Sequence, residues 1–207
     1  MFDAFVARHG KPTETTQTNV FFDVADGASY PWESFGKEIG YGGWHRGFLR
    51  IGTPELADLH DALETWQGVL PWMESRQIVA RNGWGDLILA WHEPSHQNIC
   101  RVLSGRRLAV EQPDISPNSA MMTVFRHYLT TDKRLPTPSP THPFLDDELF
   151  QTLVDDERAG EPLAATEAFL PLVPYPLGGT HEANNFVVQD LASWYSDMGT
   201  ALSTKNE

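Results

Sequence analysis

Two short patterns in the chain contain residue types that could carry chemistry, and both include histidine. Residues 92–96 (HEPSH) match H-E-x-x-H, in which two histidines one helical turn apart bind zinc and the glutamate acts as a base. Proline at the third position would interrupt the helix that has to present both histidines. The preceding residues 87–91 also have the composition of a strand. We therefore interpret the match as a strand-ending turn with exposed histidines.

The second pattern is residues 174–182 (PYPLGGTHE), in which His181 and Glu182 follow a glycine pair. A glycine turn can bring a base and its partner to a reactive position. The alternative, which we favour, is structural: Glu182 lies near the positive end of a following helix, and His181 caps that helix or faces solvent. A hydrolase site around His181 stays open as the enzyme hypothesis.

Other catalytic signatures are missing from the sequence. Ser104 and Ser139 lack the G-x-S-x-G turn of a nucleophilic serine, and Cys100 falls in a predicted strand, where a buried and inert thiol is usual. Neither G-x-G-x-x-G nor a Walker loop occurs, so the glycines of residues 40–43 are expected to form a turn. The sequence therefore predicts no catalytic residue, no metal site and no cofactor.

The elements that would position any site begin with an N-terminal helical turn or two at Phe2, Phe5 and Val6. Residues 29–53 combine aromatic residues with glycine and proline, which predicts short elements and turns leading to a strand at 48–51. A helix then opens at Thr53, the expected N-cap. Its buried stripe is Leu56, Leu59, Leu63 and Trp66. Strands of an antiparallel meander follow at 77–81, 86–91, 98–103 and 106–111. The tryptophans beside glycine turns, Trp44 and Trp84, are expected to fill the core.

The sequence of the second half predicts mainly helical structure. A linker at 113–117 precedes a helix at 120–130, and the proline-rich segment 135–143 is expected to be extended. Further helices are predicted at 144–159 and from about Asn185 to Leu202, the last with Asn184 and Asn185 as caps. The expected fold is α+β: an antiparallel β-sheet with packed helices in a domain of residues 1–112, followed by a mainly helical C-terminal domain at 118–204. Packing of the two as one unit stays open.

Composition points to a globular protein of the cytoplasm. Hydrophobic residues make up 41% of the 207 residues, which is enough for a substantial core. The single cysteine excludes an internal disulfide, and no signal-like apolar run precedes residue 30. No run of eighteen apolar residues occurs, so we expect no membrane span.

The net charge of -13 is concentrated in the second half. Residues 1–112 carry fourteen acids against ten Lys and Arg, whereas residues 113–207 carry fourteen against five, giving -4 and -9. Between residues 135 and 204 the only Lys or Arg is Arg158, among eleven acids. Such a surface disfavours direct nucleic-acid binding and would attract a basic protein. Simple solvation of an acidic face is the alternative.

Three segments together resemble a known pair of domains. Residues 35–48 (FGKEIGYGGWHRGF) and 80–91 (ARNGWGDLILAW), after the N-terminal stretch 2–12, are similar to the GAD-like domain. Residues 175–186 (YPLGGTHEANNF) with the closing helix resemble the C-terminal domain of type VI secretion immunity proteins that neutralise DNase effectors. The proline-rich segment 135–143 departs from the simplest pattern of that family.

The resemblance implies a cytoplasmic bacterial antitoxin that binds a cognate basic nuclease and performs no reaction. From the charge pattern we expect the acidic helix of the second half to contribute to the toxin interface. The candidate residues are Asp146, Asp147, Glu148, Asp155, Asp156 and Glu157. A scaffold or regulatory module similar to the Smi1/Knr4-like group, which also uses glycine-rich turns around a small sheet, stays open as a non-enzymatic alternative.

Overall fold

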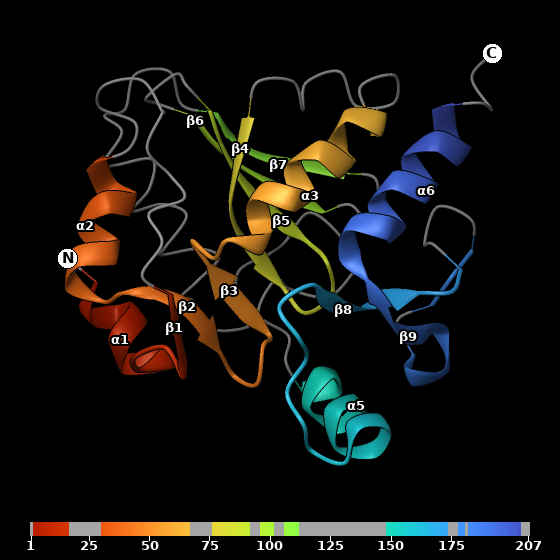
Figure 1. The fold of residues 1–207 in the computed structure, drawn as a ribbon, viewed down its shortest axis with the longest axis horizontal. Helices are drawn as coiled ribbons and strands as arrows, with labels where there is room; N and C mark the ends of the chain where they lie inside the picture. Colours follow the sequence, from red (N-terminus) through yellow and green to blue (C-terminus); the bar gives the residue numbers. More distant parts are fainter. Residues whose placement is uncertain are drawn as a thin grey trace.

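The computed structural model describes residues 2–16, 30–66, 76–91, 96–101, 106–111, 148–173, 178–180 and 182–203. Within these residues the chain has a mixed α+β fold (Figure 1). A seven-stranded sheet has its strands in sequence order from β1 to β7, and a two-stranded sheet is formed by β8 and β9. The expected α+β class, with an antiparallel sheet and packed helices, is confirmed.

Every neighbouring pair in the large sheet is antiparallel. Its strands are β1 (Glu14–Thr16), β2 (Tyr41–Trp44), β3 (Leu49–Ile51), β4 (Arg76–Asn82), β5 (Leu87–Trp91), β6 (His96–Arg101) and β7 (Arg106–Glu111). The four-strand meander predicted from turn spacing is confirmed as β4 to β7. His96 begins a strand, so it cannot be the second histidine of a zinc-binding helix, and residues 92–95 lie outside the described part of the chain.

The helices of the first half are α1 (Asp3–His9), α2 (Tyr30–Glu38) and α3 (Glu55–Leu63), the last extended by the 3-10 turn η1 (Glu64–Trp66). Figure 1 shows α1 and α2 beside β1 and β2, and α3 crossing in front of the sheet. The sequence predicted α1 and α3 but only short elements where α2 forms. Gly36 lies within α2 because the ring of Tyr41 packs against its backbone, where a Cβ would collide.

The start of α3 differs from the prediction. The helix begins at Glu55 after Pro54, and no side-chain cap is formed. Thr53 is 3% exposed, and its hydroxyl has no hydrogen-bond partner among the described residues. The Leu56 amide instead donates to the Thr53 backbone carbonyl at 3.1 Å. The Thr53 side chain therefore faces the interior and does not act as the predicted N-cap.

The C-terminal part contains α5 (Glu148–Arg158), β8 (Glu167–Pro171), the 3-10 turn η6 (Ala183–Asn185), β9 (Phe186–Asp190) and α6 (Leu191–Ser203). The predicted helix at 144–159 is confirmed over the described residues 148–158, with Phe150 and Leu153 buried. The helix predicted at 120–130 and the linkers at 113–117 and 135–143 lie outside the described residues. No prediction had placed the β8–β9 hairpin in this part.

The last helix begins six residues later than predicted, at Leu191. Residues 186–190 pair with β8, so that Val188 lies opposite Phe169 and Asp190 opposite Glu167. The prediction counted Val187 into the helical stripe because Val187 lies four residues before Leu191, which is the spacing of one helical turn. Pairing with β8 decides for the strand, and Asn184 and Asn185 are therefore not caps of α6.

One hydrophobic core joins the two halves of the chain. Trp84, from the turn between β4 and β5, is fully buried. Its ring lies 5.9 Å from Phe150 of α5, 6.3 Å from Phe169 of β8 and 4.7 Å from Phe186 of β9. The prediction that Trp84 fills the core is confirmed. The residues on either side of the expected domain boundary thus share a single buried cluster.

Three arginines of the first half attach the backbone that follows α5. Arg46 Nε donates to the Gly160 carbonyl at 3.2 Å, Arg50 Nη2 to Leu163 at 3.1 Å and Arg81 Nη2 to Ala165 at 2.6 Å. The carbonyls belong to a segment without regular hydrogen-bonded structure, which needs donors from elsewhere. The arginines supply them and so attach residues 160–165 to β3, to β4 and to the turn before β3.

Candidate partner-binding surfaces

The acidic helix proposed from the sequence is α5. Of the six candidate carboxylates, Glu148, Asp155, Asp156 and Glu157 lie on this helix and are exposed, whereas Asp146 and Asp147 lie outside the described residues. The buried side of α5 faces Trp84 and Phe48 through Phe150. The helix therefore presents its carboxylates to solvent, as the amphipathic pattern predicted.

Asp155 is bound within the molecule. Its Oδ1 lies 2.7 Å from Arg46 Nη2, and the Asp155 side chain is 63% exposed. Arg46 also donates to Gln151 Oε1 at 3.3 Å and thereby joins the β2–β3 turn to α5. An exposed pair of this kind contributes at most about 1 kcal/mol. Asp155 is thus less suited to a partner than Asp156 and Glu157, which the sequence alone could not distinguish from it.

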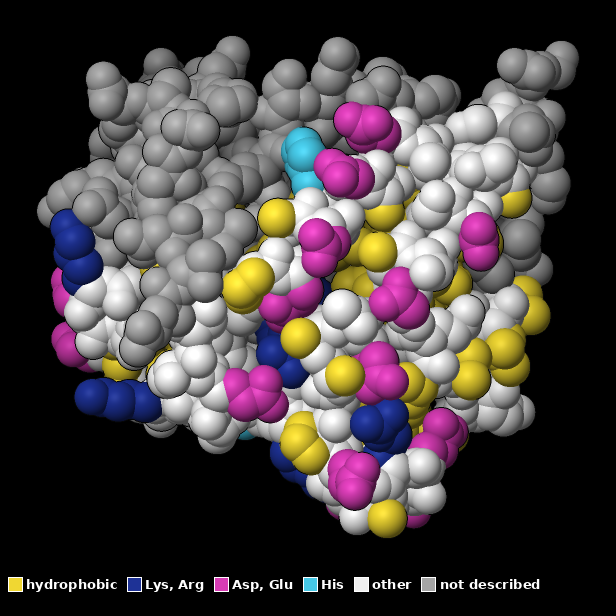
Figure 2. All heavy atoms as spheres, viewed as in Figure 1, with side chains coloured by type: hydrophobic (Ala, Val, Ile, Leu, Met, Phe, Trp, Pro, Cys, Tyr) yellow, Lys and Arg dark blue, Asp and Glu magenta, His cyan; other side chains and the backbone are white. Residues whose placement is uncertain are grey.

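A second acidic surface lies on α3 and η1. Four carboxylates follow one another at intervals of three residues, and we call them the α3 acidic stripe. The stripe consists of Glu55, Asp58, Asp61 and Glu64. Asp58, Asp61 and Glu64 are exposed, and no Lys or Arg occurs between residues 55 and 66. Figure 2 shows acidic side chains following the ridge that α3 forms on this face.

The apolar side of α3 was predicted from the sequence, whereas the stripe was not. The stripe could have been recognised from the i, i+3 spacing of its acidic residues, because residues three apart on a helix are neighbours on its surface. Carboxylates in adjacent turns repel one another by a few tenths of a kcal/mol per pair. The helix therefore keeps an arrangement that its own stability does not favour.

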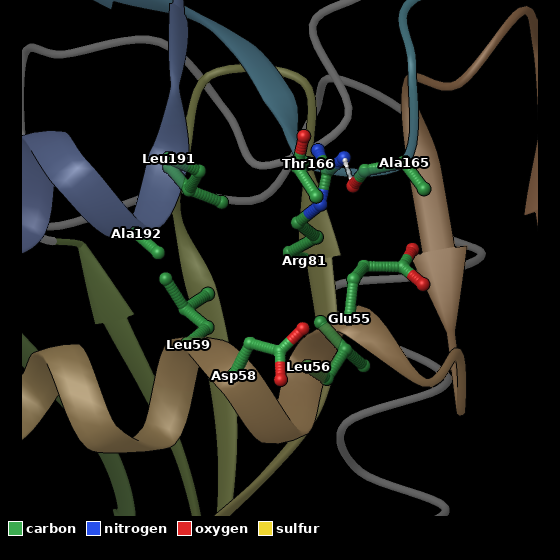
Figure 3. A pocket seen from close by; sticks show the side chains of 9 residues that line it. All are labelled: Glu55, Leu56, Asp58, Leu59, Arg81, Ala165, Thr166, Leu191 and Ala192. Atoms are coloured by element: carbon green, nitrogen blue, oxygen red, sulfur yellow. Dashed lines mark hydrogen bonds between the residues drawn. The ribbon is translucent and has the colours of Figure 1, made fainter.

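A small pocket lies beside the first turn of α3. It is lined by Glu55, Leu56, Asp58, Leu59, Arg81, Ala165, Thr166, Leu191 and Ala192. Its volume is about 20 Å³, which accommodates one water-sized group. In Figure 3, Arg81 lies at the centre of this ring of side chains, with α3 on one side and α6 on another. The pocket thus forms where both halves of the chain meet.

Arg81 is the unusual residue of the pocket, because its side chain is 0% exposed. Nη1 donates to the Asn82 carbonyl at 3.3 Å and Nη2 to Ala165, whereas Nε has no hydrogen-bond acceptor in the described part of the chain. Burial, the main cause, and the neighbouring Arg50 lower the pKa of Arg81 to about 9. At pH 7 the guanidinium is therefore still charged, in surroundings that disfavour the charge.

Glu55 connects the pocket to a second buried arginine. Glu55 Oε1 lies 3.6 Å from Arg50 Nη1, and Glu14 Oε2 lies 3.0 Å from Arg50 Nη2. These two carboxylates offset the charge of Arg50, whose side chain is only 4% exposed. Arg81 has no carboxylate within salt-bridge distance among the described residues.

Two exposed apolar residues precede the glycine-rich segment at 174–182. Leu172 and Val173, which follow β8, are 62% and 44% exposed. The buried Asn185 side chain accepts from the Val173 amide at 2.9 Å and donates to the Val173 carbonyl at 3.0 Å and the Thr180 carbonyl at 2.9 Å. Gly179 approaches the Val173 carbonyl where a Cβ would collide, so the glycine is required by close packing. His181, the candidate base, lies outside the described residues, and Glu182 is exposed.

Among the residues that the structure describes, no three His, Cys, Asp or Glu side chains are grouped as metal ligands. None of the described helices is long and apolar enough to cross a bilayer.

Comparison with known proteins reveals structural similarity without sequence-level matches. No protein-family model matches the sequence, and no curated protein matches it either. The chain shares its fold with Atu4351 from Agrobacterium tumefaciens. The crystal structure of that protein superposes with a TM-score of 0.60 and 16% sequence identity, over 97% of this chain and 89% of that chain. At this identity the similarity establishes the fold, from the first helix to the last, and nothing about activity.

Proposed function

We propose that this protein is an immunity protein that binds a cognate type VI secretion DNase and neutralises it by covering its basic DNA-binding or catalytic surface. The observation that carries the proposal is the charge of the surface. The chain has a net charge of -13, and exposed carboxylates on α3 and α5 lie on helices that contain few cations. The resemblance of the glycine-rich segments to GAD-like and immunity domains supports the same function.

The physical basis is complementarity with a nuclease. A protein that cleaves DNA presents Lys and Arg to phosphates, and these groups attract an acidic surface of matching shape. Such attraction raises the association rate, and the bound inhibitor then excludes DNA by covering the surface of the nuclease that would contact it. No chemical step is required of the inhibitor. Its place of action is the cytoplasm, where the DNA of the producing cell has to be protected.

The test is a binding and inhibition experiment with the purified nuclease encoded by the adjacent gene. Increasing amounts of this protein are added to the nuclease, and DNA cleavage is followed on a gel. We expect cleavage to stop at a 1:1 ratio and the two proteins to elute together in size-exclusion chromatography. Absence of both binding and inhibition would contradict the proposal and leave the scaffold alternative.

A further inference from the structure

We infer that the α3 acidic stripe and the pocket beside it form the surface that receives a basic segment of the partner, and that one oxygen acceptor of this segment occupies the pocket next to Arg81. The inference rests on the proposed function and names the part of the molecule that performs it. Figure 1 places α3 well apart from α5, the helix that the sequence had suggested.

Three of the four carboxylates of the stripe face solvent. Asp58, Asp61 and Glu64 are exposed, and no Lys or Arg pairs with them among the described residues. On α5, by contrast, Asp155 is paired with Arg46. These three carboxylates are therefore available to cations from outside the described part of the molecule, whereas Glu55, the fourth member of the stripe, is paired with Arg50.

Arg81 is an independent feature that points to a ligand. Buried N–H groups almost always have an acceptor, yet Arg81 Nε–H has none in the described part of the chain. The residue lines a pocket of about 20 Å³, which has room for one oxygen atom and its hydrogen bond. The pocket therefore has room for the one acceptor atom that Arg81 Nε–H lacks.

The charges around the pocket limit the chemistry of its occupant. Glu55 and Asp58 at the same pocket disfavour a free anion, and the charged Arg81 disfavours a metal cation. A basic peptide segment satisfies both requirements, because a backbone or side-chain carbonyl can accept from Arg81 while neighbouring Lys or Arg side chains meet the stripe. Figure 3 shows this juxtaposition, with the carboxylates of α3 on one side of Arg81 and the Ala165 carbonyl that it already contacts on the other.

The test compares variants of the full chain binding to a catalytically inactive form of the adjacent-gene nuclease. The stripe is reversed by Asp58→Lys with Asp61→Lys, and the pocket is filled by Ala192→Leu. Matched controls are Asp3→Lys with Glu38→Lys, which make the same charge change on α1 and α2, and Ala57→Leu on the exposed side of α3. Thr166→Leu, a second substitution that adds volume to the pocket wall, serves if Ala192→Leu fails to fold.

We expect the stripe reversal to slow association at least about tenfold at low salt, because rim charges act mainly on the association rate. Filling the pocket should raise the dissociation rate by a similar factor, and hydrogen exchange should show protection of residues 55–66 in the wild-type complex.

Unchanged rates for both variants, with weaker binding after Asp156→Lys and Glu157→Lys, would overturn the inference and leave the proposed function intact. If only the pocket variants bind normally, the pocket holds water and its part of the inference is wrong. Failure of the wild-type protein to bind would reject the proposed function itself.

Discussion

At the scale of single residues, Asp190 shows how a side chain fixes the boundary of an element. It is the last residue of β9, and its Oδ1 accepts from the Ser193 amide at 2.9 Å, the position of an N-cap bond for α6. That backbone hydrogen bond is the main reason why the pKa of Asp190 is lowered. The carboxylate therefore stabilises the helix most in its ionised form.

Asp190→Ala is expected to lower the free energy of unfolding by about 1 kcal/mol at pH 7, the usual effect of losing an N-cap. Because the pKa is lower in the folded state, the stabilisation is complete above about pH 4 and is lost as the pH falls through the folded pKa. Urea unfolding at pH 7 and at pH 2.5 measures the difference between variant and wild type. Asp197→Ala, an exposed acid within α6, is the control. A difference that stays the same at both values of pH would contradict the role of the ionised carboxylate.

Gly83 is a second residue with a specific packing requirement. The ring of Phe150 lies against its backbone, in the place that a Cβ would occupy. Gly83→Ala should therefore displace α5 from the core and destabilise the protein by about 1–3 kcal/mol, the range for overpacked cores. Gly43→Ala is the matched control, because a Cβ there meets only side-chain atoms at 3.4 Å or more. Thermal unfolding of both variants measures the effect, and equal melting temperatures would show that Phe150 can shift without loss.

At the scale of elements, α3 has two sides with different demands. Leu56, Leu59 and Leu63 are buried against the core, which stabilises the helix. On its outer side, Asp58, Asp61 and Glu64 of the α3 acidic stripe repel one another. A helix whose outer side lowers stability is expected when that side serves binding, because selection for function tolerates the loss.

Asp61→Lys alone should accordingly stabilise the protein by about 0.5–1 kcal/mol, since it replaces repulsion toward Asp58 and Glu64 by attraction. Urea unfolding measures the gain, and Asp3→Lys on α1 gives the comparison for an exposed acid outside the stripe. The same variant should bind the nuclease more weakly. A variant that loses both stability and binding would indicate a structural role for Asp61.

At the scale of the whole molecule, both halves of the chain contribute to one core, so we expect them to unfold together. Trp84 contacts three aromatic rings from the second half, and Tyr195 Oη donates to the Gly85 carbonyl at 2.6 Å. The Trp66 indole donates to the Tyr195 carbonyl at 2.7 Å. Neither half retains a complete core without the other.

We therefore expect a single cooperative transition in urea, with coincident curves from tryptophan fluorescence and far-UV circular dichroism. Trp66→Phe and Tyr195→Phe, which each remove one hydrogen bond between the halves, should shift the midpoint of that transition without splitting it. Two separate transitions would show that residues 1–112 and 118–204 are independent domains.

The charge of the whole molecule makes a further prediction about the nuclease complex. Attraction between exposed charges is screened within about 8 Å at physiological ionic strength. The association rate should therefore fall at least about tenfold between 50 and 500 mM salt, whereas the dissociation rate should change little. Stopped-flow fluorescence measures both rates. A salt-independent association rate would mean that the net charge of -13 serves solubility alone.

Much of the fold was predictable because local patterns and tertiary packing agree. The meander β4 to β7 follows from turn residues between short apolar runs, and α3 and α5 follow from their apolar stripes. The acidic surface was predictable in kind, but α5 received the emphasis because its carboxylates are consecutive in the sequence. The stripe on α3 is equally visible in the spacing of its acids, whereas the pocket with Arg81 could not be foreseen.

The sequence by itself determined the class of the fold, the core tryptophans and the sign of the surface charge, since these depend on composition and local periodicity. Tertiary structure decided three things that depend on distant partners. Residues 186–190 form a strand because β8 lies beside them, Asp155 is paired because the β2–β3 turn brings Arg46 to α5, and Arg81 is buried because residues 163–166 cover it. In each case the deciding partner is at least 15 residues away in sequence, beyond the reach of any local pattern.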